Sequence, residues 1–162
     1  MIIETKEAFI DLVYNNIEII YKICNMYARE PERDDLQQEI IYQLWKSFPS
    51  FRGEAKFQTW MYRVALNTAM LGMRAWKKNQ VEFSEKENNI SDGSFEEFEL
   101  QLQIKQLYHH ISKLNDIDKA IIFLHLEQCS YKEISDITGM SEKNISVKLV
   151  RIRKKLRAMF DH

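Results

Sequence analysis

The sequence predicts an all-α protein made of two small helical units joined by an acidic segment. Its 162 residues include only four glycines and two prolines, so long helices with few turns are expected. Apolar residues recur at helical spacing along most of the chain, and no convincing period-2 pattern indicates a strand. With 45% hydrophobic and 29% charged residues, the chain is expected to fold. This length suits two small bundles with modest cores.

The first unit, residues 1–78, is expected to contain three helices. The first spans about 6–28, and Pro31 falls in the break after it. The second spans about 35–48, begins at acidic residues and stops at Pro49. The third spans about 56–76, and five of its side chains are expected to face the core: Phe57, Met61, Val64, Thr68 and Leu71.

The segment 79–97 is expected to be a linker, because it is acidic, polar and weakly periodic. Ser94 and Glu97 have the spacing of a capping box, which predicts that a helix starts near the end of this segment. The second unit, residues 98–162, is expected to contain about four helices. The first of them continues to about Leu114 and the next spans about 116–127.

The segment 130–157 has the pattern of a helix-turn-helix. Ser130 and Glu133 form a second capping box, so a short helix should begin at Tyr131. Gly139 suits the left-handed position that ends a helix, and Ser141 can cap the next one. Two short helices joined by a tight turn with glycine are the arrangement that places a recognition helix in a DNA groove.

The second helix of this motif separates an apolar face from a basic one. Its buried stripe is predicted to be Ile145, Leu149, Ile152, Leu156 and Met159. Asn144, Lys148, Arg151 and Lys155 form a second stripe, which can meet phosphates and base edges. The net charge of −1 hides this basic region, since seven Lys and Arg residues and no acidic residue lie between 143 and 157. The alternative is an ordinary helix with a solvated basic face.

This segment resembles the promoter-reading helix-turn-helix of bacterial RNA polymerase sigma factors, from Tyr131-Lys132-Glu133-Ile134 to Arg151-Ile152-Arg153-Lys154-Lys155-Leu156. In that family the second helix enters the major groove at the minus-thirty-five element. Ser146 stands where Lys or Arg is more usual. The candidate residues for upstream DNA are Lys143, Asn144, Ser146, Val147, Lys148, Arg151 and Lys155.

The first unit resembles the other half of a sigma factor in two places. The run Asp34-Asp35-Leu36-Gln37-Gln38-Glu39, followed by Leu44-Trp45, is similar to the family's polymerase-clamp segment. The resemblance implies that polymerase is bound by Asp35, Gln38, Glu39 and Trp45. Spacing alone leaves open that this is a solvated, acidic start of a helix.

The second place is FPSFRGEAKFQTWMYRVALN, residues 48–67, which is similar to the family's loop and helix at the minus-ten element. This segment places cations, which can bind the DNA backbone, beside aromatic side chains, which can hold an unstacked base. Both are needed to open DNA. Aromatic residues at this spacing are also common in cores, so each one is ambiguous. The candidate residues are Arg52, Lys56, Trp60, Arg63, Asn67 and Arg74.

Both resemblances together identify the chain as similar to the small extracytoplasmic-function group of the sigma-70 family. That implies a non-catalytic protein whose partners are core RNA polymerase, promoter DNA and an anti-sigma factor. No cofactor is expected, and Cys24, Cys129 and the histidines do not have metal-ligand spacing. A cytoplasmic location without membrane insertion is expected. The alternative is a free-standing helix-turn-helix regulator with an amino-terminal sensing or dimerisation unit. A helical enzyme is a third class, which no catalytic motif supports.

Overall fold

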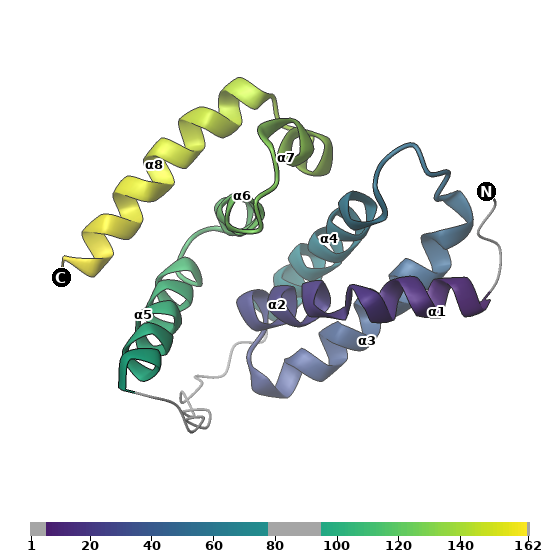
Figure 1. Ribbon diagram of the computed structural model, residues 1–162, viewed down its shortest axis with the longest axis horizontal. Coiled ribbons are helices and arrows are strands. Elements are labelled where there is room, and N and C mark those ends of the chain that lie inside the picture. The colour runs from purple at the N-terminus through teal and green to yellow at the C-terminus, as the bar shows by residue number, and fades with distance from the viewer. Residues whose placement is uncertain (1–5, 78–94, 162) are drawn as a thin grey trace.

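The computed structural model describes residues 6–77, with side chains to residue 72, and residues 95–161. Over these ranges the chain forms helices and no strand (Figure 1), as the sequence predicts. The amino-terminal unit contains α1 (Lys6–Asn15), α2 (Ile17–Tyr27), α3 (Glu30–Ser47), the 3-10 turn η1 (Phe48–Ser50) and α4 (Phe57–Lys77). The carboxy-terminal unit contains α5 (Phe95–Ile111), α6 (Asp116–Leu126), α7 (Tyr131–Thr138) and α8 (Glu142–Phe160).

The first predicted helix is divided in two at Asn16. This residue has φ −122° and ψ 18°, and its side-chain amide donates to the carbonyl of Leu12 at 2.8 Å. A short polar side chain that bonds nearby backbone competes with the helical hydrogen-bond ladder. The expected single helix over 6–28 is therefore α1 followed by α2.

Helix α3 begins five residues before its predicted start, and Pro31 lies inside it rather than in a break. Proline is favourable in the first turn of a helix, because its fixed φ is helical and its missing N–H would have no partner there. Pro31 occupies that turn, after Arg29 as the cap residue. The predicted stop at Pro49 is confirmed, since the chain leaves the α-helix at Ser47 and forms η1.

The amino-terminal core lies between α2, α3 and α4, which pack on one another. Five of its largest fully buried side chains are Ile20, Ile23, Ile40, Leu44 and Met61. In α4, Phe57 and Met61 are buried as predicted, and Val64 and Thr68 are half-buried. Leu71 was expected in the core but is 64% exposed. The buried face of α4 instead runs through Met61, Ala65 and Ala69, at four-residue spacing, where alanine allows close approach of neighbouring helices.

The carboxy-terminal core is centred on α6, which packs against both α7 and α8. Its apolar residues Ala120 to Leu124 are all buried, so this short helix is covered on every side. Helix α5 packs on α8 through its last turns, and Ile111 is fully buried. Helix α5 begins at Phe95, inside the predicted linker; residues 79–94 of that linker, including the predicted cap Ser94, lie outside the described residues.

The two units touch, and their buried side chains form one continuous cluster. Helix α4 of the first unit packs against α7 of the second, and Figure 1 shows α6 and α7 on the side of the carboxy-terminal unit that faces α4. The sequence left the relative orientation of the two units open. None of the described helices combines the length and the apolar character needed to cross a bilayer.

Candidate nucleic-acid interface

Helices α7 and α8 form the predicted helix-turn-helix, and each of the two helices begins at its predicted cap residue. The Ser130 hydroxyl accepts from the Glu133 backbone N–H at 3.1 Å, and the Glu133 carboxylate accepts from the Ser130 N–H at 3.2 Å. Ser141 caps α8 by accepting from the Asn144 N–H at 3.1 Å. Gly139 has φ +78°, and a Cβ there would meet no atom within 4 Å. Backbone conformation, not space, therefore requires glycine at this turn.

Helix α8 is held to its unit by the predicted apolar stripe. Ile145, Leu149, Ile152 and Leu156 are buried, and Met159 is partly buried against the core. At 100° per residue, the opposite face is centred on Lys143, Val147 and Arg151. Five of the predicted DNA-binding residues are exposed there: Lys143, Asn144, Val147, Arg151 and Lys155. This face can therefore enter a groove without disturbing the packing of α8.

The other two predicted residues, Ser146 and Lys148, are half-buried at the margins of that face. The Lys148 ammonium lies 3.1 Å from a carboxylate oxygen of Asp118 on α6, whose side chain is only 7% exposed. Asp118 also accepts from the side-chain amide of Asn115, which caps α6. Lys148 thus joins the recognition helix to α6, a contact that the sequence did not indicate.

In the amino-terminal unit, four aromatic rings surround the loop before α4. Trp60 has its ring centroid 5.2 Å from Phe51, 5.5 Å from Phe57 and 6.2 Å from Phe48. Trp60 is half-buried by this packing, so it has both a core role and an open side. The structure thus explains why spacing alone left Trp60 ambiguous.

A hollow of about 180 Å³ opens beside this aromatic cluster, between the loop and the first turns of α4. It is smaller than the roughly 300–1,000 Å³ of usual small-molecule sites. Arg52, Trp60 and Arg63 line it together with Phe51, the acidic residue Glu54 and the small residues Ser50, Ala55 and Thr59. The structure therefore brings together three of the six predicted minus-ten residues.

The remaining minus-ten candidates extend along α4 and the loop before it. Lys56 and Asn67 are exposed, while the side chain of Arg74 lies outside the described side chains. Arg63 is exposed too, but its guanidinium donates to the backbone carbonyl of Asp136 on α7. One cation of the predicted DNA-binding face is thus already in contact with the other unit.

The predicted polymerase-binding residues lie on the outer side of α3. Asp35, Gln38 and Glu39 are exposed, and Trp45 is 46% exposed one to two turns further along. Trp45 packs edge-to-face on Phe9 of α1, with ring centroids 5.1 Å apart. Such a face combines charge with an aromatic anchor, a mixture that is common in protein interfaces.

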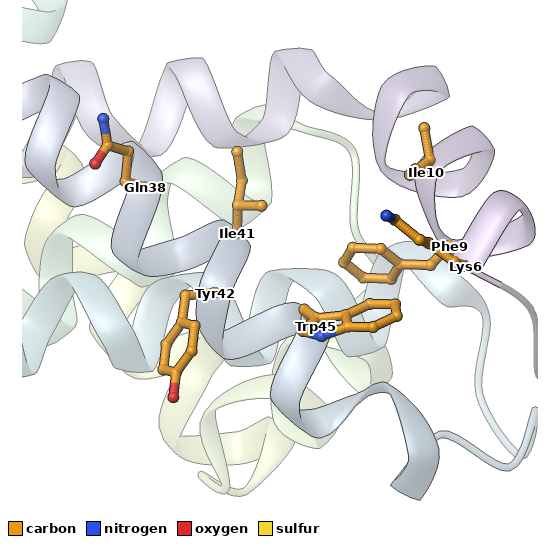
Figure 2. A pocket seen from close by; sticks show the side chains of 7 residues that line it. All are labelled: Lys6, Phe9, Ile10, Gln38, Ile41, Tyr42 and Trp45. Atoms are coloured by element: carbon orange, nitrogen blue, oxygen red, sulfur yellow. The ribbon is translucent and has the colours of Figure 1, made fainter.

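Between α1 and α3 this side of the unit forms an apolar groove of about 360 Å³. Figure 2 shows Phe9 and Trp45 against each other at one end of the groove and Gln38 toward the other. Ile10 and Tyr42 also line the groove and are 51% and 55% exposed, which the sequence did not indicate. An apolar residue at helical spacing gives no sign of exposure until the packing of its helix is known.

The described residues contain no group of three or more potential metal ligands, and Cys24 and Cys129 are free thiols. Burial raises the pKa of both thiols to about 11. Neither thiol is therefore activated as a nucleophile at neutral pH.

Comparison with known proteins gives matches in both units. The family model described as Sigma-70 region 2 matches residues 12–79, and that described as Sigma-70, region 4 matches residues 104–156. The extracytoplasmic-function (ECF) RNA polymerase sigma-E factor of Escherichia coli K12 is 27% identical over 161 residues, covering 92% of this chain and 84% of that protein. The sigma-E factor of Haemophilus influenzae is 26% identical and covers 92% and 85%.

The solved structures with a similar fold include two complexes. CnrH in complex with the cytosolic domain of CnrY has a TM-score of 0.69 at 20% identity, covering 98% of this chain and 90% of that chain. The sigma factor RpoE in complex with the anti-sigma factor NepR from Bartonella quintana has a TM-score of 0.71 at 16% identity, covering 93% and 97%.

Proposed function

The chain belongs to the extracytoplasmic-function group of the sigma-70 family, and we propose that it directs core RNA polymerase to promoters through three separate surfaces. One surface on α3 binds polymerase, one on α4 binds opened DNA, and one on α8 reads duplex DNA upstream. The observation that carries this proposal is the pairing of a region 2 unit with a region 4 unit in one chain. A free-standing regulator needs only a helix-turn-helix, so it leaves the region 2 match unexplained.

The recognition surface is the exposed face of α8. We assign upstream base reading to Lys143, Asn144, Val147 and Arg151, because base-reading side chains come from the first turns of a recognition helix. Lys155, further along, supplies charge for phosphates. Ser146 and Lys148 contribute from the margins of the face, and Lys148 keeps its pairing with Asp118.

The melting surface is the hollow beside Trp60 and the face of α4 that continues from it. Arg52 and Arg63 line the hollow, so an unstacked base placed against Trp60 would have cations on hand for its phosphates. Lys56 and Asn67 extend the polar face, and Arg74 is assigned to it by the resemblance. Each single contact is weak and salt-sensitive.

The two weak DNA-binding surfaces recognise a promoter specifically when polymerase holds both of them. Linking two binding modules raises the effective concentration of the second after the first has bound. Recognition then depends on both promoter elements and on their separation. The chain itself performs no chemistry in this scheme, since polymerase makes the phosphodiester bond, and the proposed location is the cytoplasm, where polymerase acts.

We also propose that an anti-sigma factor holds this chain. The two similar solved structures are complexes, one with the cytosolic domain of CnrY and one with the anti-sigma factor NepR. The apolar groove between α1 and α3 and the exposed apolar residues of α5, such as Leu100 and Ile104, are surfaces on which a partner can dock.

The experiment that tests the function is transcription with sigma-free bacterial core polymerase. The purified chain should make transcription start at specific sites in a library of genomic fragments, and core alone should not. Replacing both Asp35 and Glu39 with lysine should weaken binding to core. Replacing both Glu96 and Glu99 with lysine reverses the same number of exposed charges on α5, in the other unit, and is the matched control. If the chain binds duplex DNA specifically without polymerase and never stimulates core, the regulator is the correct alternative.

A further inference from the structure

Lys148 and Lys155 lie on the same side of the recognition helix α8, about two turns apart, but their surroundings differ. Lys155 is exposed. The Lys148 side chain is only 33% exposed, and its ammonium lies 3.1 Å from a carboxylate oxygen of Asp118 on α6. Asp118 therefore distinguishes two lysines that belong to one basic stripe in the sequence.

The carboxylate of Asp118 is fixed in place by the start of α6. Asp118 lies in the first turn of this helix, where the helix dipole favours a negative charge. The Asn115 side chain accepts from the Asp118 backbone N–H at 2.9 Å, and its amide donates to the second carboxylate oxygen at 3.2 Å. The Asp118 side chain is 7% exposed, so water solvates it poorly. If Lys148 left, a nearly buried charge would lose its counter-charge, which is costly.

The position of Lys148 on α8 decides what its ammonium would reach if it were released. Val147 lies at the centre of the exposed face, and one residue turns the helix by about 100°, so Lys148 stands at the margin of that face. Side chains at the margin of a recognition helix are placed toward the phosphates beside the groove. A lysine ammonium is a point charge on a flexible stem, so a released Lys148 would bind phosphate whatever the sequence.

We propose that Asp118 is a positioning residue for upstream DNA binding, which holds the Lys148 ammonium on α6 and so removes one cation from those that can bind DNA phosphates. The inference rests on the proposed role of α8 in reading upstream DNA. The methylene stem of Lys148 stays at the margin of the DNA-binding face, while its charge is neutralised within the protein. Each phosphate that is left without a cation lowers the affinity for every sequence alike. Binding by α8 then stays weak alone and needs the second contact that polymerase provides.

The first test measures the reactivity of lysines in the unmutated full chain, so it does not depend on any variant folding. The chain is acetylated with an N-hydroxysuccinimide ester, with and without a short duplex DNA of mixed sequence at low salt, and is mapped peptide by peptide. Lys148 should react more slowly than Lys155 in the free chain, because its ammonium is paired and less exposed. DNA should protect Lys155 strongly and change the reactivity of Lys148 much less.

The second test is the salt dependence of binding to the same duplex. Asp118→Asn keeps the shape of the side chain and removes the charge that holds Lys148. One additional phosphate contact should steepen the slope of log K against log salt by about one unit and raise the affinity up to about tenfold at physiological salt. Adding Lys148→Met to Asp118→Asn should remove both changes.

Asp161→Asn is the matched control for the second test. Asp161 is exposed at the end of α8, about 20 Å along the helix from Lys148, so this variant measures the effect of net charge alone. Thermal unfolding followed by circular dichroism checks that each variant is folded at the temperature of the assay. With polymerase holoenzyme, Asp118→Asn should strengthen binding to cognate and altered upstream elements alike.

Four results would overturn the inference. If DNA protects Lys148 as strongly as Lys155 in the unmutated chain, Lys148 already binds phosphate. Equal salt slopes for Asp118→Asn and Asp161→Asn would show that Asp118 withholds no cation. A gain that survives Lys148→Met would have another source, and a gain confined to the cognate element would make Lys148 a reader of bases. Transcription by core polymerase with the unmutated chain tests the proposed function separately, because it does not depend on where the charge of Lys148 lies.

Discussion

The ion pair between Lys148 and Asp118 makes a sharp prediction about the recognition helix. Lys148→Met keeps the length of the side chain and removes its charge. The ammonium lies 3.1 Å from a carboxylate that is 7% exposed, while the lysine side chain itself is 33% exposed. In the variant, Asp118 keeps its contact with the Asn115 amide at 3.2 Å but loses its counter-charge.

The loss of folding free energy in Lys148→Met lies between two limits. Breaking a fully buried pair costs about 3–5 kcal/mol, whereas exposed pairs contribute about 0–1 kcal/mol. Because one partner is nearly buried and the other reaches solvent, we expect Lys148→Met to lower the free energy of unfolding by about 1–3 kcal/mol. For a chain of this size, 2 kcal/mol corresponds to a fall in Tm of roughly 4–8 °C.

The assay is denaturant unfolding of a double-mutant cycle with Asp118→Asn. Since both residues belong to one contact, the double variant should be less destabilised than the sum of the single variants by about 1 kcal/mol or more. Lys155→Met, exposed on the same helix, is the matched control and should stay within about 0.5 kcal/mol of the natural chain. If Lys148→Met is no more destabilising than Lys155→Met and no coupling appears, the pair does not hold α8 on α6, and Lys148 is free to read DNA.

Three further predictions concern the turn, the recognition face and the thiols. Gly139→Ala should destabilise the carboxy-terminal unit by about 1–2 kcal/mol in thermal unfolding, because φ +78° strains any side chain although no atom would clash; an unchanged Tm would contradict this. Arg151→Ala in holoenzyme should lose about 1–3 kcal/mol on the cognate upstream element and flatten discrimination among altered elements, whereas Lys155→Ala should weaken all of them alike and lower the salt slope by about one unit. A selective loss for Lys155 and a uniform one for Arg151 would reverse these roles. Burial raises the pKa of the Cys24 and Cys129 thiols to about 11, above the value of about 8.5 in an unfolded chain, so the folded state binds these protons more tightly. The free energy of unfolding that they contribute is therefore full below about pH 8.5 and should fall as the pH rises toward 11. A free energy of unfolding that stays constant over this pH range would refute the prediction.

Local sequence determined the helix-turn-helix almost completely. The capping box at Ser130 and Glu133, the left-handed Gly139, the cap at Ser141 and the buried stripe of α8 all appear as predicted. Each of these features depends on residues within about one or two turns of one another, so a single sequence contains the information. The all-α class and the order of the two units follow from periodicity in the same way.

Packing decided which face of a helix is buried, whereas the exact helix boundaries were decided locally. The break at Asn16 and the early start of α3 are small local choices, and propensity alone does not decide between them. Leu71 fits a helical stripe drawn from Phe57, but α4 turns a neighbouring stripe of small residues to the core and leaves Leu71 in solvent. When a helix has apolar residues on several sides, its sequence does not show which side is buried. The helices that pack against it decide that.

Contacts between distant residues were decided by tertiary structure alone. Lys148 and Asp118 are 30 residues apart, and Lys22 and Glu127 are 105 apart. The sequence does not show which residue a charged side chain pairs with. The energy of an ion pair depends on distance and burial, which only the folded chain sets. Residue types and spacing therefore determined that this protein has two helical units with basic and acidic faces. Only the tertiary structure decided which of those charges remain exposed and which are already paired within the chain.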